Sequence, residues 1–287
     1  MNESTSIKLI ECPRDAMQGL HDFIPTALKA EYINQLLKVG FDTIDFGSFV
    51  SPKAIPQMRD TAKLVKKIDL SNTKTQLLAI IANTRGAQDA CAFDEISYLG
   101  FPFSVSETFQ QRNTNSSIED ALIRVEEIQN LCIKNNKKAV VYLSMGFGNP
   151  YGDPYNEEIL VHWAEKLIHL DIEILALSDT IGVSTPAKIK EIYPNLVHHF
   201  PKIEWGMHLH STPEQSDEKI KAAFESGCKR FDSALKGFGG CPMAADNLTG
   251  NIATEKVVDY LSTKEKLINF NPKAWKDALL FSSKIFF

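Results

Sequence analysis

Two of the seven histidines lie two residues apart in the stretch GMHLHST (206–212). If this stretch is a β-strand, alternation places His208 and His210 on one face and Met207 and Leu209 on the other. A pair of this kind is compatible with two half-buried histidines, and equally with one half of a metal site. The choice depends on which other side chains the fold brings beside the pair.

Acidic, basic, amide and hydroxyl residues also follow the other apolar runs of the chain. These residues are Arg14, Asp15, Asp45, Ser144, Asn149, Asp179, Thr180 and Lys236. Asp15 and the two histidines, with one further oxygen donor, would form a site of mixed nitrogen and oxygen ligands. Such a donor set favours Mg²⁺ or Mn²⁺ over Zn²⁺, because the sequence has no thiolate spacing typical of zinc sites.

Eight short apolar runs, alternating with amphipathic stretches, would have to position these residues. The predicted strands span 7–12, 42–47, 75–81, 95–104, 139–147, 172–179, 203–210 and 230–237. Several of the stretches between them begin on Ser, Thr or Asn, and two end at Gly40 and Gly227, as helices do. Regular alternation predicts a parallel sheet covered by helices, and eight such units predict an α/β fold, the (β/α)8 TIM barrel, with the active site at the C-terminal ends of the strands.

The absence of a G-x-G-x-x-G after the first predicted strand argues against an open dinucleotide-binding sheet. We therefore predict a single barrel domain over residues 1–287, with a short helical extension from about 254 to 287.

Composition excludes several classes of partner. The formal net charge is −5 and no basic run occurs, so a nucleic-acid partner is not expected. No apolar stretch approaches 18 residues and the first residues lack a secretory signal, so no membrane association is expected. The five cysteines are scattered without a CxxC motif, which favours a reducing compartment, and we predict a cytoplasmic location.

Seven segments together resemble the 3-hydroxy-3-methylglutaryl-CoA lyase family, within the wider group of metal-dependent barrel lyases and aldol or Claisen-type synthases. The segments are PRDAMQ (13–18), SFVSPKAIPQM (48–58), SETFQQRNTNSSIEDA (106–121), SDTIGVSTP (178–186), HLH (208–210), GFGGCPMA (237–244) and TGNIATE (249–255). The R-D-x-x-Q and H-x-H motifs are shared across the whole group. SFVSPK and GGCP are narrower and indicate the lyase branch.

The resemblance implies an enzyme that cleaves 3-hydroxy-3-methylglutaryl-CoA, or a close 3-hydroxyacyl-CoA, to acetyl-CoA and acetoacetate. An acyl-CoA thioester is then the partner, a divalent metal (Mg²⁺ or Mn²⁺) is the cofactor, and we expect a homo-oligomer, specifically a dimer. The residues that it assigns to the metal are Asp15, His208, His210 and Asn251. The catalytic set comprises Arg14, Asp15, Asp45, Asp179, His208 and Cys241, and the residues assigned to cofactor binding are Gln18, Ser48 and Asn113.

Retro-aldol chemistry explains these residue types. A divalent metal that chelates the substrate hydroxyl and carboxylate lowers the pKa of the hydroxyl, and a nearby Asp or His can take its proton. Arg14 would stabilise the enolate oxygen that develops as the C–C bond breaks. Cys241, or a water that it holds, could reprotonate the enolate carbon from a loop whose glycines let it open and shut. Asp179 would support the ligands rather than bind the metal.

Three departures from the family pattern leave the acyl substrate open. Asp45 stands where the family usually has Glu, Ser211 where Asp or Asn usually follows H-x-H, and Gly19-Leu20 where Asn-Glu is common. The shorter Asp45 moves its carboxylate by about 1.5 Å, a displacement that can lower a rate about 100-fold. Two alternatives therefore stay open, a Claisen-type acyl-CoA synthase acting on a 2-oxo acid and a binding barrel that has lost catalysis. Only a short segment follows Asn251, which disfavours the synthase.

Overall fold

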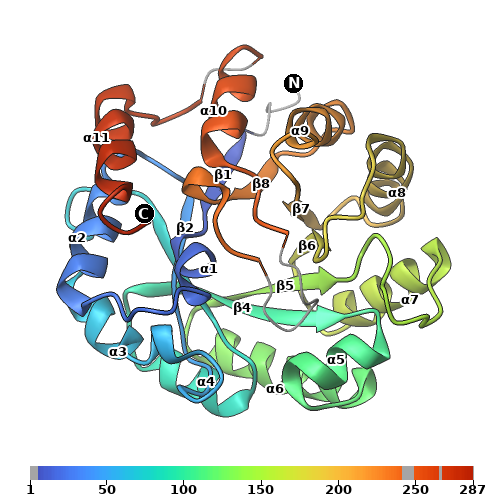
Figure 1. The fold of residues 1–287 in the computed structure, drawn as a ribbon. Helices are drawn as coiled ribbons and strands as arrows, with labels where there is room; N and C mark the ends of the chain where they lie inside the picture. Colours follow the sequence, from blue (N-terminus) through green and yellow to red (C-terminus); the bar gives the residue numbers. More distant parts are fainter. Residues whose placement is uncertain (1–5, 241–248, 265–266, 287) are drawn as a thin grey trace.

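Eight parallel strands close into a barrel in the order of the sequence (Figure 1). The computed structural model describes residues 6–240, 249–264 and 267–286. The strands are β1 (Lys8–Glu11), β2 (Thr43–Ser48), β3 (Gln76–Ile80), β4 (Ile96–Ser104), β5 (Lys138–Ser144), β6 (Ile174–Asp179), β7 (Glu204–Leu209) and β8 (Arg230–Ser233). Closure is made by β8 on β1, where Leu9 pairs with Phe231 and Glu11 with Ser233. Each strand begins within two residues of its predicted start, and the (β/α)8 barrel prediction is confirmed.

Helices connect successive strands, and most of them cover the outside of the barrel, whereas the short helix after β1 lies inside this ring and contributes to the cavity at the strand ends (Figure 1). They are α1 (Pro13–Gln18), α2 (Thr26–Leu37), α3 (Thr61–Leu64), α4 (Thr84–Cys91), α5 (Glu107–Thr114), α6 (Ile118–Lys134), α7 (Glu157–Ile168), α8 (Pro186–His199), α9 (Ser216–Glu225), α10 (Thr254–Ser262) and α11 (Pro272–Ser282). Short 3₁₀ turns occur at Pro56–Met58, Val65–Lys67 and Leu235–Gly237. None of the helices in the described part of the chain combines the length and the apolar character needed to cross a bilayer.

Local sequence explains where the helices begin and end. The side-chain oxygens of Asn83, Ser106, Ser117 and Thr185 each accept a hydrogen bond from a backbone N–H in the first turn of the following helix. These bonds satisfy donors that have no partner inside the helix. At the other end, Gly227 follows α9 with φ +87°, a left-handed conformation that a residue with a Cβ adopts at a cost.

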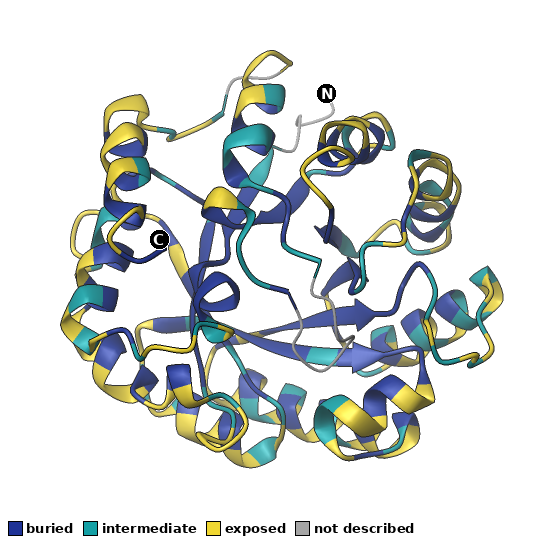
Figure 2. Cartoon of the chain, in the orientation of Figure 1, coloured by how far each residue is buried: buried dark blue, intermediate teal, exposed yellow. Residues whose placement is uncertain are grey.

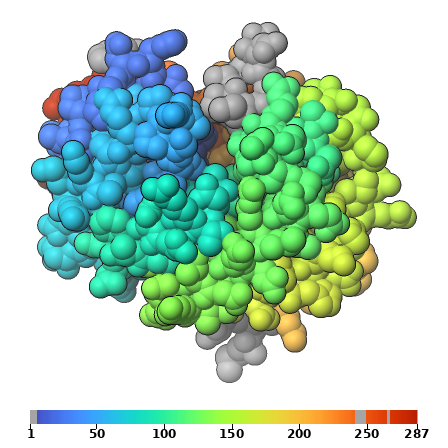
Figure 3. All heavy atoms as spheres, turned by 90° about the horizontal axis from the view of Figure 1, so that it is seen from below, coloured from blue at the N-terminus to red at the C-terminus, as the bar shows by residue number. Residues whose placement is uncertain are grey.

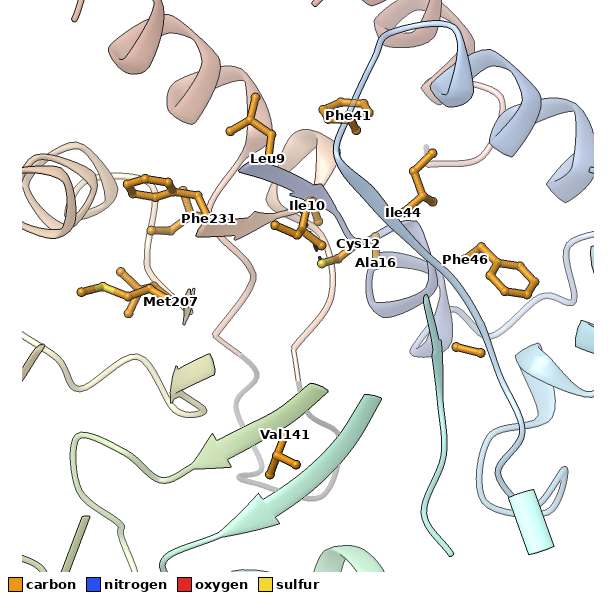
Figure 4. Close-up of a cluster of buried hydrophobic side chains, with 14 of the residues drawn as sticks. Leu9, Ile10, Cys12, Ala16, Phe41, Ile44, Phe46, Val141, Met207 and Phe231 are labelled. Carbon is orange, nitrogen blue, oxygen red and sulfur yellow. Dashed lines mark hydrogen bonds between the residues drawn. The ribbon is translucent and has the colours of Figure 1, made fainter. Parts of the chain in front are cut away.

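Apolar residues on the two faces of the strands fill two separate regions. A small cluster of Leu78, Val140, Tyr142, Ile174 and Ala176 occupies the barrel interior. Strand residues that face the helices belong to a larger cluster, which also includes Ile10 of β1 and part of which appears in Figure 4. The strands are therefore buried on both sides and the exposed residues lie on the outer helix faces and loops (Figure 2).

The last two helices, α10 and α11, each pack against a different helix of the outer ring. The α10 helix lies beside α9, and α11 lies beside α2 (Figure 1). The ring of Phe281 in α11 stacks on Tyr32 of α2 with centroids 6.1 Å apart. Helices thus occur within 254–287 as predicted, and the division into one barrel domain with an extension stays a prediction.

Candidate active site

A cavity of about 430 Å³ opens at the C-terminal ends of the strands. Its wall includes Ser48 from β2, Ile80 from β3, Ser144 from β5 and Thr180 after β6, together with residues of α1 and α5. Seen from the side, the surface is hollowed at this end between the blue-to-cyan and the green parts of the chain (Figure 3). In a barrel of this class, the end that carries the C-termini of the strands is where chemistry is expected.

Asp15, His208 and His210 meet in the wall of this cavity, and we refer to them as the Asp–His–His cluster. One side-chain ligand atom from each of the three residues lies within 4.8 Å of the others. The two imidazoles face one another, with their Nε2 atoms 3.2 Å apart. The same-face prediction for the histidine pair is therefore confirmed, and α1 supplies the carboxylate because it follows β1 directly.

Hydrogen bonds on the far side of each ring set the protonation of the histidines. Nδ1 of His208 lies 3.2 Å from the carboxylate of Asp232, and Nδ1 of His210 lies 3.0 Å from the carbonyl oxygen of Thr180. Because that carbonyl can only accept, Nδ1 of His210 carries a proton, and an ionised Asp232 requires the same of His208. Both Nε2 atoms are thereby directed at the same point.

Burial opposes a charge on either ring. For His208 the hydrogen bond and the negative charge of Asp232 outweigh burial and raise its pKa, whereas burial and the neighbouring His208 lower the pKa of His210 to about 4. With a proton on each Nδ1, the two Nε2 atoms point lone pairs at each other, and the raised pKa of His208 eases this repulsion by favouring a further proton on its ring.

The donor set of the cluster fits a divalent cation. Adjacent ligands of an octahedral ion bound at about 2.1 Å lie about 3 Å apart, close to the 3.2 Å between the two Nε2 atoms. A cation between the two Nε2 atoms would accept both lone pairs and would be balanced by the carboxylate of Asp15. Burial raises the pKa of Asp15, but the charge of Arg14, then those of the histidines, outweigh it and lower the pKa to about 2, so the carboxylate is ionised.

Arg14 is held between two carboxylates in the cavity wall. Its Nε lies 3.0 Å and its Nη2 2.5 Å from Oδ2 of Asp45, while Nη1 donates to Oδ1 of Asp15 at 2.9 Å and to Gln18 Oε1 at 3.0 Å. Four of its five N–H groups are used in these bonds, which leaves one on Nη2. Burial raises the pKa of Asp45 to about 6 even though Arg14 opposes the shift. Asp45 itself is absent from the cavity lining and contacts the site through Arg14.

Asn251 reaches the cluster from the segment that returns after β8. The segment forms an antiparallel bridge between Asn251 and His210, and a backbone bond of 3.3 Å runs from Ile252 N to Leu209 O. The side-chain nitrogen of Asn251 donates to Oδ2 of Asp15 at 2.5 Å and to the carbonyl of Phe238 at 2.9 Å. Asn251 is thus brought to the cluster, and in this structure it holds the Asp15 carboxylate with its amide nitrogen.

Asp179 faces away from the cavity. Its carboxylate accepts hydrogen bonds from the backbone N–H groups of Val183 and Ser184 and from Nζ of Lys219 at 3.0 Å. The buried Lys219 also donates to the carbonyl of His210 at 2.9 Å. Asp179 therefore supports the turn after β6 and, through Lys219, the backbone that carries His210.

Gln18, Ser48 and Asn113, predicted to bind the cofactor, all line the cavity. Cys241 lies outside the described residues. Sequence reasoning missed Asp232, Lys219 and Arg112, the last of which lines the cavity from α5. Asp232 lies in a predicted strand, one position after an apolar residue, and Lys219 lies on the apolar face of an amphipathic stretch. At Asp232 and at Lys219, a polar residue occupies a position where the pattern predicts a buried apolar one. That mismatch was the signal in the sequence that could have identified these two residues.

Fold and site together define a (β/α)8-barrel protein with a carboxylate–imidazole cluster at the C-terminal ends of its strands. A family model described as HMGL-like matches residues 7–279, and the chain belongs to this family.

Relatives and solved structures agree with that assignment. The hydroxymethylglutaryl-CoA lyase YngG of Bacillus subtilis is 34% identical over 257 residues, covering 87% of this chain and 82% of the relative. The cytoplasmic 3-hydroxy-3-methylglutaryl-CoA lyase of Homo sapiens is 32% identical over 259 residues, covering 89% of this chain and 69% of the relative. A structure of an HMG-CoA lyase from Acinetobacter baumannii, in complex with coenzyme A and 3-methylmalate, matches with TM-score 0.90 at 28% identity, covering 99% of this chain and 92% of that one.

Proposed function

We propose that this protein is a divalent-metal-dependent carbon–carbon lyase that cleaves 3-hydroxy-3-methylglutaryl-CoA to acetyl-CoA and acetoacetate. The observation that carries the proposal is the convergence of Asp15, His208 and His210 beside Arg14 in one cavity. Relatives of this chain named hydroxymethylglutaryl-CoA lyases support the substrate.

The net reaction breaks one carbon–carbon bond and moves one proton from the hydroxyl oxygen to carbon. The C3 hydroxyl loses its proton, the C2–C3 bond breaks, C3 becomes the ketone of acetoacetate, and the electron pair stays on C2 as the enolate of acetyl-CoA, which is then protonated. We propose Asp15, His208, His210 and Asn251 as the residues that hold the metal. When bound, the metal would supply a Lewis acid for the substrate hydroxyl and carboxylate.

Arg14 is positioned to stabilise the enolate. Its pairing with Asp45 and Asp15 fixes the guanidinium in the wall of the cavity, and the remaining Nη2–H can donate to the thioester oxygen as that oxygen gains charge. A donor fixed before the reaction needs no reorganisation when the charge appears. Asp45, although one methylene shorter than Glu, keeps a bidentate contact with Arg14, and we propose that it acts by holding this residue in place.

Few groups in the cavity can accept the proton of the substrate C3 hydroxyl. Asp45 and Asp179 do not line the cavity, so among the described acids and histidines of the predicted set, Asp15, His208 and His210 are the groups that a substrate hydroxyl could meet. We propose that the proton leaves through this cluster and that Cys241, as predicted from its glycine-flanked loop, or a water that it holds, protonates the enolate carbon.

Other lining residues suit an acyl-CoA. The Oγ of Ser48 is buried in the wall without a hydrogen-bond partner among the described residues, so a substrate oxygen can supply one. Ile80, Pro102 and Tyr142 give an apolar surface for the methyl-bearing carbon. Arg112 is the one cation besides Arg14 among the described lining residues, and we propose that it binds the negatively charged coenzyme A moiety.

An acetyl-CoA release assay tests the proposal. Purified protein is freed of metal with a chelator, supplied with Mg²⁺ or Mn²⁺, and offered 3-hydroxy-3-methylglutaryl-CoA and a panel of other 3-hydroxyacyl-CoA thioesters. We expect acetyl-CoA and acetoacetate in equal amounts from 3-hydroxy-3-methylglutaryl-CoA, and only with metal present. No acetyl-CoA from this thioester with either metal would overturn the proposal, and release from a different thioester would correct the substrate.

We also propose a cytoplasmic location and a dimer for this protein. Relatives of this chain carry both cytoplasmic and mitochondrial names, so the name of a relative does not decide the compartment. Size-exclusion chromatography with light scattering tests the dimer.

A further inference from the structure

A fully buried carboxylate, that of Glu11 at the end of β1, joins the two ends of the connection that leads from β8 to α10. At the first end, the backbone N–H of Leu235 donates to Glu11 Oε1 at 2.9 Å. At the second end, the hydroxyl of Thr254, the first residue of α10, donates to Glu11 Oε2 at 2.6 Å and lies 3.0 Å from the hydroxyl of Ser233. We call Glu11, Leu235 and Thr254 the Glu11 clamp.

Backbone bonds carry the effect of the clamp towards the cavity. The N–H of Ala234 donates to the carbonyl of Ile252 at 3.1 Å, and the N–H of Thr254 donates to the carbonyl of Ala234 at 3.1 Å. The returning segment therefore runs beside the end of β8 for the residues between Asn251 and the clamp. Its position decides where the Asn251 amide meets Asp15.

The first end of the connection needs such support because its backbone is strained. Lys236, the neighbour of Leu235, has φ +63°, a left-handed conformation that costs a residue with a Cβ free energy. A second carboxylate, that of Glu255, accepts the N–H of Lys236 at 3.0 Å. Strained residues persist where their surroundings over-determine them, and here two carboxylates hold two consecutive N–H groups.

Burying an acid at this point is costly. Burial raises the pKa of Glu11 to about 8, although the hydrogen bonds from Thr254 and Leu235 oppose the shift. An apolar residue would avoid that cost, so the acid has a role that an apolar side chain cannot fill, namely a hydrogen bond to each end of the connection.

We propose that Glu11 is a positioning residue of the active site, which fixes Asn251 against Asp15 by holding both ends of the β8–α10 connection. The inference rests on the proposed function for the role of Asn251 at the metal. The inference itself concerns the position of Asn251. Loosening the clamp should displace this residue and weaken metal binding, although no metal ligand has been changed.

Thr254→Val tests the clamp with the smallest change. Valine keeps the shape of threonine and removes the hydroxyl that reaches Glu11. The matched control is Thr75→Val, since Thr75 is also buried and donates its hydroxyl to the carbonyl of Phe41 at 2.7 Å, at the opposite end of the barrel. Mn²⁺ is titrated into each metal-free protein, without substrate, and binding is followed by calorimetry or by the loss of the free Mn²⁺ electron-spin-resonance signal.

We expect Thr254→Val to bind Mn²⁺ about tenfold more weakly than wild type, as is typical of changes to the outer partners of a metal ligand, and Thr75→Val to bind within twofold of wild type. Glu11→Ala should weaken Mn²⁺ binding at least as much. Glu11→Gln should restore it, since the amide oxygen can accept from Leu235 and the amide nitrogen can donate to Thr254. If Glu11→Ala does not fold, Thr254→Val and Glu11→Gln still decide the matter.

A double-mutant cycle tests whether the clamp acts through Asn251. In the Asn251→Ala background, Thr254→Val should weaken Mn²⁺ binding by less than twofold further, because the residue that the clamp positions has been removed. Equal Mn²⁺ affinity in wild type and Thr254→Val, a fully additive effect with Asn251→Ala, or a wild type that binds no Mn²⁺ would each overturn the inference. Absence of acetyl-CoA release by wild type, with the affinity pattern as expected, would overturn the proposed function alone.

Discussion

Replacement of Arg14 by Met separates a catalytic role of this residue from a structural one, provided that its partner is changed as well. Arg14 lies between Asp45 and Asp15, and the side chains of all three are at most 10% exposed. Methionine removes the cation and leaves two buried carboxylates without it. Removal of one partner of a buried ion pair costs about 3–5 kcal/mol, so we expect the free energy of unfolding of Arg14→Met to fall by about that amount. If Arg14 also stabilises the enolate oxygen, kcat should fall by roughly 10²–10³-fold with a small change in KM.

The double variant Arg14→Met/Asp45→Asn distinguishes the two effects. Asparagine removes the charge that Arg14 balances, so most of the lost stability should return while kcat stays low. Urea unfolding midpoints and acetyl-CoA release rates are measured on the same preparations of wild type, the single variant and the double variant. Recovery of kcat together with stability would show that Arg14 serves only to neutralise Asp45, and would refute the assignment of Arg14 to the enolate.

Three further predictions concern stability, the loop cysteine and coenzyme A. The pKa of Glu11 is raised from 4.5 to about 8, so the protonated acid stabilises the fold below pH 4.5 and this contribution is lost as the pH rises through 8. At about 1.4 kcal/mol per pKa unit, this loss amounts to about 5 kcal/mol at most. The free energy of unfolding of Glu11→Gln should therefore change less between pH 5 and pH 9 than that of wild type. Parallel pH profiles of the two proteins would contradict this prediction. Cys241→Ala should lose most of its turnover while still binding the thioester, and a near-normal kcat would show that the loop cysteine is not the acid. Arg112→Ala should raise KM for the thioester about tenfold with kcat within twofold, the expected effect of losing one charge-assisted hydrogen bond, and an unchanged KM would remove Arg112 from coenzyme A binding.

The repeat of apolar runs was sufficient to predict the barrel, and the polar residues after those runs include Ser144 and Thr180, which line the cavity. Each strand is buried on both faces, so its sequence is a near-continuous apolar run, and polar residues stand out where the strand stops. The same alternation predicted that His208 and His210 share a face, and the directness of the β1–α1 connection placed Arg14 and Asp15 beside them.

Contacts that depend on barrel closure could not be read from the sequence. The pairing of Arg14 with Asp45 joins β2 to the helix after β1, and the approach of Asn251 to Asp15 joins residues from opposite ends of the chain. Asp179 was expected to support the ligands rather than bind the metal, but the partners that hold its carboxylate, the turn after β6 and Lys219, could not be foreseen. The direction in which a residue at a strand end points depends on the local turn, which alternation does not determine.

We propose that metal held by the Asp–His–His cluster is required for cleavage of 3-hydroxy-3-methylglutaryl-CoA. The most direct test titrates Mn²⁺ into metal-free wild type and His210→Ala and follows Mn²⁺ binding and acetyl-CoA release in the same samples. We predict that wild type gains activity in proportion to the Mn²⁺ it binds, and that His210→Ala, although folded, binds Mn²⁺ at least tenfold more weakly and releases acetyl-CoA only at correspondingly higher Mn²⁺, if at all. Equal Mn²⁺ affinity in the two proteins, or full acetyl-CoA release by wild type in the presence of excess chelator, would contradict the account.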